Sequence, residues 1–219
     1  MKGVLTLTDG ERGKGEKILR LEVLRRMVDE RFPEAVRPAE GAGGGEEEGI
    51  PRGVLTEVHG SLGSISLFLL GELMRDERIF AGVVDAADAL EAGEFSSGVL
   101  RRMLWVRCQG AVKAVQAADL LLRDGNLPLV FLDLRGVAPE GLAKVPASTW
   151  HRFQKLLEGH PLSLAVCTDR PCIAPARVRI EVQGSWVLRD LVRPRAELME
   201  RLRVHRRQRG MPVEQRRTA

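Results

Sequence analysis

The chain contains no tyrosine, and aromatic residues make up only 4% of its 219 residues. A surface that binds single-stranded nucleic acid by base stacking needs several exposed rings, so this composition argues against such a platform. The only cysteines are Cys108, Cys167 and Cys172, an odd and sparse set that argues against a disulfide framework. The four histidines are scattered. We therefore expect no structural zinc, no other metal and no bound cofactor.

Long apolar runs are also absent. No stretch of about 18 apolar residues occurs, which argues against a transmembrane helix and a membrane partner. The opening residues, MKGVLTLTDGERGKGEK, hold no apolar run of the kind found in a signal peptide. We therefore expect a cytoplasmic protein. With 44% apolar and 29% charged residues, the composition is typical of a globular α/β domain with short extensions.

Charge is distributed unevenly along the chain. The net charge is +4, but residues 189–219 contain ten arginines and four acidic residues, so the rest of the chain is slightly acidic. A basic segment of this kind attracts nucleic acid or an acidic protein surface. It also serves as a solvated tail that keeps a protein soluble, and charge alone does not separate these interpretations.

The first 50 residues divide into a helix and a linker. Residues 17–32 carry Leu21, Leu24 and Val28 at spacings of three or four, which predicts an amphipathic helix within an N-terminal region of residues 1–33. Residues 34–50 are rich in glycine, glutamate and proline and show no apolar periodicity. They predict a linker.

Residues 51–192 predict a core domain in which strands and helices alternate. The expected strands are apolar on both faces, which favours parallel strands covered by helices on both sides. We expect strands over residues 53–60, 79–85, 103–108, 127–134 and 161–168, and helices over residues 61–76, 95–103, 111–125 and 148–158.

The pattern changes after residue 176. Residues 177–182 and 185–191 alternate in polarity around Gln183 and Gly184, which predicts a terminal β-hairpin. Pro194 then stands where it would begin a last helix, which we expect to end at Gly210. Residues 193–219 are thus predicted to form a basic helix and tail.

The turn after the first core strand lies where a phosphate binds in a doubly wound sheet. A working phosphate loop reads G-x-x-x-x-G-K-[ST]. Here the corresponding residues are Gly60, Ser61, Gly63, Ser64 and Ile65. Ser64 stands in the place of the lysine and Ile65 in that of the magnesium-binding hydroxyl, so the stabilisation needed for phosphoryl transfer is lost. The alternatives are a tight strand-to-helix turn and weak phosphate binding by backbone N–H groups.

Two segments give this turn a context. VVDAADALE (83–91) resembles the second-strand motif of the RecA recombinase family, but Ala87 stands in the place of its catalytic glutamate and Asp88 in that of its histidine. LWVRCQGAVKAVQAADLLLRDGNLPLVFLDLRG (104–136) resembles the strand, helix and Walker B strand of that family, with Asp133 matching the Walker B aspartate. The resemblance implies a RecA-like core with a mostly parallel central sheet. With the lysine, hydroxyl and glutamate all missing, we expect no ATP hydrolysis and no catalytic residue.

A narrower resemblance is to the ImuA-type (SulA-like) proteins of bacterial mutagenesis cassettes. It is carried by GIPRGVLTEVHG (49–60), by the short hairpin ending and by the arginine-rich tail. It implies an accessory role in SOS-induced translesion synthesis, through contacts with RecA and with a Y-family polymerase-like partner. The alternatives are a module that binds DNA through the basic tail and a weak nucleotide-sensing switch.

The expected contact residues lie on the two terminal helices. Leu21, Leu24 and Val28 form the apolar face of the first helix. On the last helix, a narrow apolar stripe that includes Leu198 and Leu202 is flanked by Arg201, Arg206 and Arg207. Such a stripe predicts a helix that docks in a partner groove, with its arginines against a partner or DNA. The alternative is a helix packed on its own domain with a solvated outer face.

Overall fold

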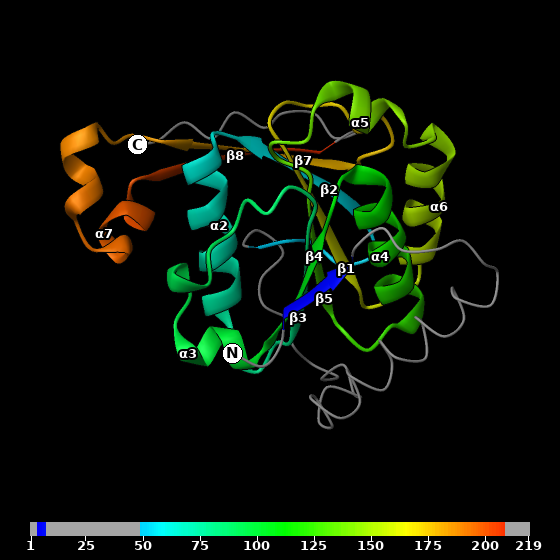
Figure 1. Cartoon of the computed structure of the whole chain (residues 1–219), viewed down its shortest axis with the longest axis horizontal. Coiled ribbons are helices and arrows are strands. Elements are labelled where there is room, and N and C mark those ends of the chain that lie inside the picture. The colour runs from blue at the N-terminus through cyan, green and yellow to red at the C-terminus, as the bar shows by residue number, and fades with distance from the viewer. Residues whose placement is uncertain (1–3, 8–48, 209–219) are drawn as a thin grey trace.

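The computed structural model describes residues 4–7 and 49–208. An eight-stranded sheet runs through the middle of the molecule, with helices on both of its faces (Figure 1). The predicted helix of residues 17–32, with Leu21, Leu24 and Val28, lies outside the described residues. The same is true of nearly all of the predicted linker and of the tail from residue 209 onward.

The strand order is β1-β4-β3-β5-β6-β2-β7-β8, and every neighbouring pair is parallel except β7 and β8. This is the predicted α/β architecture, a mostly parallel sheet flanked by helices, and it ends in an antiparallel strand pair. The strands are β1 (Val4–Leu7), β2 (Leu55–Gly60), β3 (Ala81–Asp85), β4 (Met103–Cys108), β5 (Leu129–Asp133), β6 (Ser163–Thr168), β7 (Val178–Gly184) and β8 (Leu202–Gln208).

The central strands explain why the sequence selects a parallel sheet. Every residue of β3, β5 and β6 is buried, because helices cover both faces at the middle of the sheet. β1 was not expected from the sequence. Its four residues pair with Trp105 to Cys108 of β4, and an isolated run of four residues gives too short a pattern to distinguish a strand.

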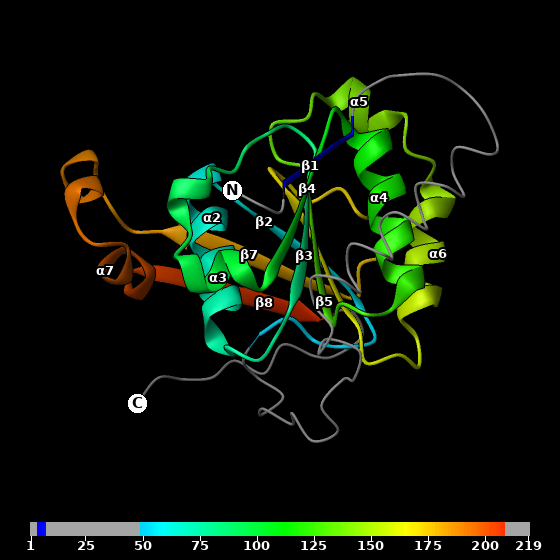
Figure 2. The ribbon, with the colours of Figure 1, turned by 60° about the horizontal axis from the view of Figure 1, so that its bottom comes forward.

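The helices form two layers, which Figure 2 shows on opposite sides of the sheet. On one side, α2 (Leu62–Arg75) and α3 (Ser97–Arg101) pack over a core that includes Phe131 and Ile180. On the other side, α4 (Ala111–Asp124), α5 (Pro139–Ala143) and α6 (Ala147–Leu157) contribute to or pack against a second core with Leu132 and Leu164. A short 3-10 helix, η1 (Ala92–Glu94), precedes α3.

The end of the described chain differs from the prediction. β7 pairs not with residues 185–191 but with β8, in a register that runs from Val178 opposite Gln208 to Gly184 opposite Leu202. The predicted helix of residues 193–209 is therefore wrong over most of its length. Only α7 (Arg195–Glu200) is helical there, with Pro194 as its N-cap residue. The sheet thus extends past residue 192, where the predicted core domain ends.

A physical reason for this difference lies in the ladder between β7 and β8. Seven residue pairs join the strands, and these long-range hydrogen bonds outweigh the helix propensity of an arginine-rich segment. The β7–β8 connection, residues 185–201, holds a 3-10 helix, η2 (Leu188–Val192), and α7. It extends away from the sheet (Figure 1).

Candidate functional site

The connection between β2 and α2 is a single residue. β2 ends at Gly60 and α2 begins at Leu62, so Ser61 alone joins them. Ser61 caps the helix: its Oγ accepts a hydrogen bond from the Ser64 N–H at 3.3 Å, and its carbonyl oxygen accepts one from Ile65 N–H at 3.0 Å. The Ser61 side chain therefore engages the Ser64 amide, one of the N–H groups at the start of this helix. The geometry is that of a tight strand-to-helix turn.

The other predicted residues of this turn are buried, lie against a neighbouring strand or face open space. Ser64 is buried, with its Oγ 2.6 Å from the Ser61 Oγ. Ile65 is fully buried in the core beneath α2. A Cβ atom added to Gly60 would collide with the Val182 carbonyl oxygen on β7, whereas one added to Gly63 would meet nothing within 4 Å. Gly60 is thus required by the close approach of a neighbouring strand.

Asp133 lies at the end of β5, as the sequence predicts, and its carboxylate is occupied. Arg135 donates from Nε to one carboxylate oxygen at 2.8 Å and from Nη2 to the other at 2.5 Å. Its Nη1 donates to the Ser66 Oγ on α2 at 3.0 Å. Both charged side chains are fully buried. In P-loop ATPases the aspartate at this position holds magnesium, whereas here the guanidinium of the same chain lies against it.

Arg135 keeps its positive charge in this buried pair. Burial opposes the positive charge of Arg135, but the hydrogen bonds and attraction from Asp133 outweigh it and raise the Arg135 pKa. A two-point arginine–carboxylate pair is among the stronger polar contacts in proteins. The two charges cancel, so the pair leaves no net charge to attract a ligand.

A second acid, Asp85, ends β3 directly beside Asp133 in the strand register. Burial raises the pKa of Asp85, and the neighbouring Asp133 carboxylate raises it further. Its oxygens accept hydrogen bonds from the N–H groups of Ala87, Ala89 and Leu90 at 3.0 to 3.3 Å. Asp85 therefore holds the turn that follows β3.

That turn carries Ala87 and Asp88, the two residues compared with the RecA motif in the sequence analysis. Ala87 has no group that accepts a proton. Asp88 has a φ of 57° and pairs through both carboxylate oxygens with Arg107, whose guanidinium also lies over the Trp105 ring. This pair is partly exposed to solvent. The turn therefore presents a methyl group at position 87 and an ion-paired carboxylate at position 88.

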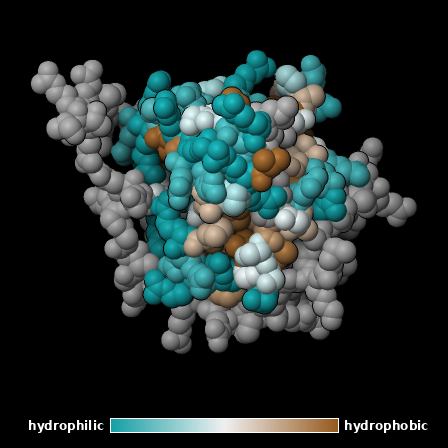
Figure 3. Space-filling model, turned by 90° about the vertical axis from the view of Figure 1, so that its left-hand side faces the viewer, coloured by the Kyte–Doolittle hydropathy of each residue, from teal (hydrophilic) through white to brown (hydrophobic). Residues whose placement is uncertain are grey.

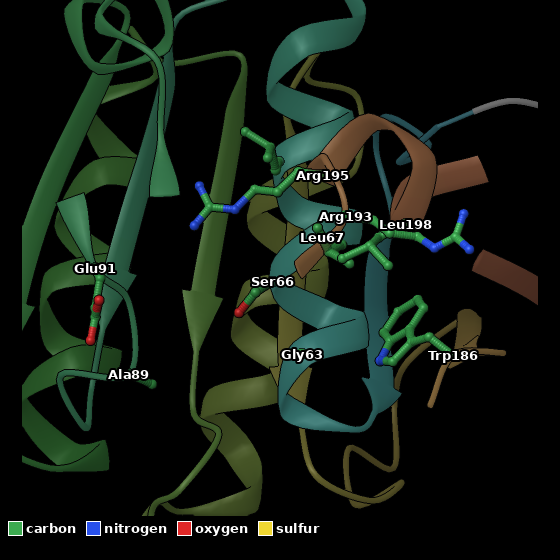
Figure 4. A pocket seen from close by; sticks show the side chains of 10 residues that line it. Gly63, Ser66, Leu67, Ala89, Glu91, Trp186, Arg193, Arg195 and Leu198 are labelled. Atoms are coloured by element: carbon green, nitrogen blue, oxygen red, sulfur yellow. The ribbon is translucent and has the colours of Figure 1, made fainter. Parts of the chain in front are cut away.

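A groove of about 440 Å³ lies along α2, and its lining includes Ser66, which accepts the hydrogen bond from Arg135. Figure 4 shows Ala89 and Glu91 on one side of α2, with Trp186 and Leu198 on the other. Its remaining lining consists of Gly63, Ser66, Leu67, Leu70, Arg193 and Arg195. The groove is thus bounded in part by the β7–β8 connection.

The structure separates the C-terminal contact residues predicted from the sequence. Leu198 is buried and Leu202 packs against the core beneath α2. Arg201 pairs with Asp190 at 3.2 Å. Arg206 is half-buried and donates to the Gly49 carbonyl oxygen, and Arg207 is exposed. They therefore do not form one face of a helix.

Sequence reasoning missed Arg135. An arginine just after a strand is typical of an exposed loop, and its contact with Ser66 spans 69 residues of sequence. The available signal was a cation two residues after the strand-end aspartate, in a chain that lacks the loop lysine. Among residues 4–7 and 49–208, no three His, Cys, Asp or Glu side chains gather as a metal site would require. Within that same part of the chain, no helix is both long and apolar enough to span a membrane.

Comparisons with known proteins give a fold-level likeness. No protein-family profile matches the chain, and no curated protein matches it significantly. Among solved structures, the chain is similar to that titled the crystal structure of the RadB recombinase, at 12% sequence identity and a TM-score of 0.47. That match covers 61% of this chain and 76% of the other. A likeness at this level supports no conclusion about this chain.

Proposed function

We propose that this protein is a catalytically inactive RecA-like accessory protein that works through contacts with other proteins in SOS-induced translesion synthesis. One observation carries the proposal of inactivity: Arg135 occupies both carboxylate oxygens of Asp133 in a fully buried pair. Magnesium binding at Asp133 would require that pair to break and would leave a buried guanidinium without its partner. Breaking such a pair costs about 3–5 kcal/mol.

The other groups needed for phosphoryl transfer are absent by residue type. Ser64 and Ile65 supply neither the cation nor the metal ligand, and both are buried. Ala87 cannot orient a water molecule. Catalysis of this reaction consists of positioning and charge stabilisation, so we infer that the protein neither hydrolyses ATP nor uses it as a switch.

The proposed partners are RecA and a Y-family polymerase-like protein, as implied by the resemblance of residues 49–60, the hairpin ending and the arginine-rich tail to the ImuA-type proteins. Within the described chain, the β7–β8 connection best suits such contacts. Val187 and Val192 are 54% and 90% exposed, and Trp186 is partly exposed. On this side of the molecule a cluster of apolar residues interrupts a mostly hydrophilic surface (Figure 3). Exposed apolar clusters with a tryptophan favour protein interfaces.

Calorimetry tests the first half of this proposal. The full-length protein is titrated with ATP and magnesium, and its thermal unfolding is followed with and without them. We expect no saturable heat and no shift of the unfolding temperature. Saturable binding that disappears in Asp133→Asn would show a working site at the end of β5, and the proposal of an inactive core would fail.

Pull-down experiments test the second half. The double variant Trp186→Ser/Val192→Ser should recover RecA and the polymerase-like partner far less well than the wild-type chain. Val112→Ser is the matched control, because Val112 on α4 is 40% exposed on the other side of the sheet. Full recovery by the double variant would remove the assigned contact surface. If the wild-type chain recovers neither protein, the partners themselves are wrong.

A further inference from the structure

The arginines of β8 lie on two different faces of the sheet. Arg206 follows Val204 on the face that packs toward α2, where it donates to the Gly49 carbonyl oxygen and is attracted by Glu72. Burial lowers the pKa of Arg206, although Glu72 opposes this effect. Arg203, His205 and Arg207 alternate with these residues and are all exposed. Strand geometry therefore gathers three basic side chains on one open face.

Neighbouring strands extend this face. The register sets Arg207 opposite Arg179 and His205 opposite Glu181, and His59 of β2 lies beside Glu181 on the other side. A groove of about 590 Å³ runs over these positions. We call it the basic groove, lined by His59, Arg177, Arg179, Glu181, His205 and Arg207.

Some of these charges already have partners. Arg179 pairs with the fully buried Glu57 at 2.9 Å, and Arg177 pairs with Glu158 at 2.6 Å. Glu57 also accepts hydrogen bonds from the backbone N–H groups of Cys172 and Ile173, so it fixes the loop that borders the groove.

Two arginines on this face remain available. No carboxylate of residues 4–7 and 49–208 forms an ion pair with Arg203 or Arg207. The one acidic side chain that lines the groove, Glu181, accepts a hydrogen bond from Gln183 at 2.7 Å. Arg207 lines the groove and Arg203 lies beyond it on the same face of β8, so this open face carries two arginines without an ion-pair partner among residues 4–7 and 49–208.

We propose that the basic groove, together with Arg203 beyond it on the same face of β8, binds the sugar–phosphate backbone of a nucleic acid. Residues two apart on a strand are about 7 Å apart, so Arg203 and Arg207 present charge over a span of about 13 Å along β8. Among residues 4–7 and 49–208, no aromatic side chain lines the groove, so the described lining offers phosphate contacts without base stacking or sequence preference. The proposal goes beyond the function proposed above and does not depend on it.

A simpler role for these residues is protection of an exposed sheet edge, since charged side chains on an edge strand prevent pairing with other chains. That role involves β8 alone and predicts no nucleic-acid binding. The basic groove differs from it because Arg207 borders a concave surface that continues over polar side chains of β7 and β2.

Fluorescence anisotropy of the full-length protein with labelled DNA, single-stranded and duplex, tests the proposal at several salt concentrations. We expect affinity to fall as salt rises. Arg203→Gln/Arg207→Gln should weaken binding at low salt by about tenfold or more, and reduce the slope of log affinity against log salt by about 2. Both side chains are exposed, so the variant should fold normally.

Two control variants remove the same charge elsewhere. Arg78→Gln/Arg101→Gln changes exposed arginines near α2 and α3, on the other face of the sheet. Arg216→Gln/Arg217→Gln changes the tail. We expect both controls to keep the wild-type salt slope within about one unit. An equal loss in either control, or no binding by the wild-type protein, would overturn the proposal. So would polyglutamate displacing DNA as well as unlabelled DNA does, because the groove would then fit an acidic protein.

Discussion

Two groups of charged side chains lie on the same sheet and differ in whether their charges are already paired. At the carboxyl ends of β3 and β5, Asp85, Asp133 and Arg135 are completely buried, and hydrogen bonds within the chain engage all three. On the open face of β7 and β8, Arg203 and Arg207 are exposed and form no ion pair within residues 4–7 and 49–208.

The comparison separates position in a fold from capacity to bind. Ligands of open α/β sheets bind beyond the carboxyl ends of the strands, and Asp133 lies there. Its charge is nevertheless cancelled by Arg135, so this position has little left to offer a ligand. The basic groove lies on one face near the sheet edge, yet Arg207 in it and Arg203 beyond it are exposed to solvent. Whether a charged side chain already has a partner within the chain therefore matters more for our functional proposals than its position in the sheet.

The largest effect should come from breaking the buried pair. Arg135→Ala leaves the carboxylate of Asp133 buried without its cation, and we expect the free energy of unfolding to fall by about 3–5 kcal/mol. For a domain of this size, that lowers the unfolding temperature by about 6–20 °C. Urea unfolding and calorimetry measure both quantities.

Two further variants control for the loss of volume. Arg135→Lys keeps the charge but not the two-point contact, so its stability should lie between those of the wild type and Arg135→Ala. Replacing both partners, as Asp133→Leu/Arg135→Met, should recover most of the loss because no unpaired charge remains buried. If the free energy of unfolding of Arg135→Ala lies within about 1 kcal/mol of the wild-type value, the pair is not a strongly stabilising contact.

The next largest effect concerns the two glycines of the β2–α2 turn. Gly60→Ala places a Cβ atom against the Val182 carbonyl oxygen and should destabilise the fold by about 1–3 kcal/mol. Gly63→Ala adds a methyl group to α2 in open space and should stabilise it by about 0.5 kcal/mol. Chemical unfolding of both variants checks the ranking. The reverse order would mean that Gly63 provides backbone freedom the turn requires.

Local pattern was sufficient for much of the core. The strands of residues 79–85, 127–134 and 161–168 were predicted because their apolar runs lie between turn signals, and β3, β5 and β6 are indeed buried on both faces. Asp133 was placed at a strand end by the same reasoning. Within such segments the periodicity of neighbouring residues carries the information.

The features on which the functional proposals rest depend on contacts between residues that are far apart in the sequence. Arg135 becomes a buried residue only because Asp133 and Ser66 meet it in the folded chain. Residues 202–208 become a strand because β7 offers a partner edge, although their composition predicts a helix. No local pattern reports either contact. The contacts predicted for Leu21, Leu24 and Val28 stay predictions.

A pH-dependent effect should follow from Glu72 of α2, which lies near Arg206 on the inner face of β8. Burial raises the pKa of Glu72, although Arg75 opposes this effect. The stability linked to a raised carboxyl pKa is fully present below the unfolded value of 4.5 and is lost as pH rises through the folded value. The free energy of unfolding of Glu72→Gln, relative to that of the wild type, should therefore be higher at about pH 7 than at about pH 4. Urea unfolding at both pH values checks this, and a difference of the opposite sign would contradict it.

The smallest effect on stability, and the sharpest form of the comparison, comes from β8 itself. Arg203→Gln/Arg207→Gln changes solvated side chains and should alter the free energy of unfolding by less than about 0.5 kcal/mol. Arg206→Gln removes a half-buried donor to Gly49 and should cost about 1 kcal/mol, with no change in the salt dependence of DNA binding. Unfolding and anisotropy measured on the same preparations separate the two roles. Arg206→Gln could instead lower the slope of log affinity against log salt as much as Arg203→Gln/Arg207→Gln does. In that case the alternation of side chains along β8 does not divide its arginines into a structural face and a binding face.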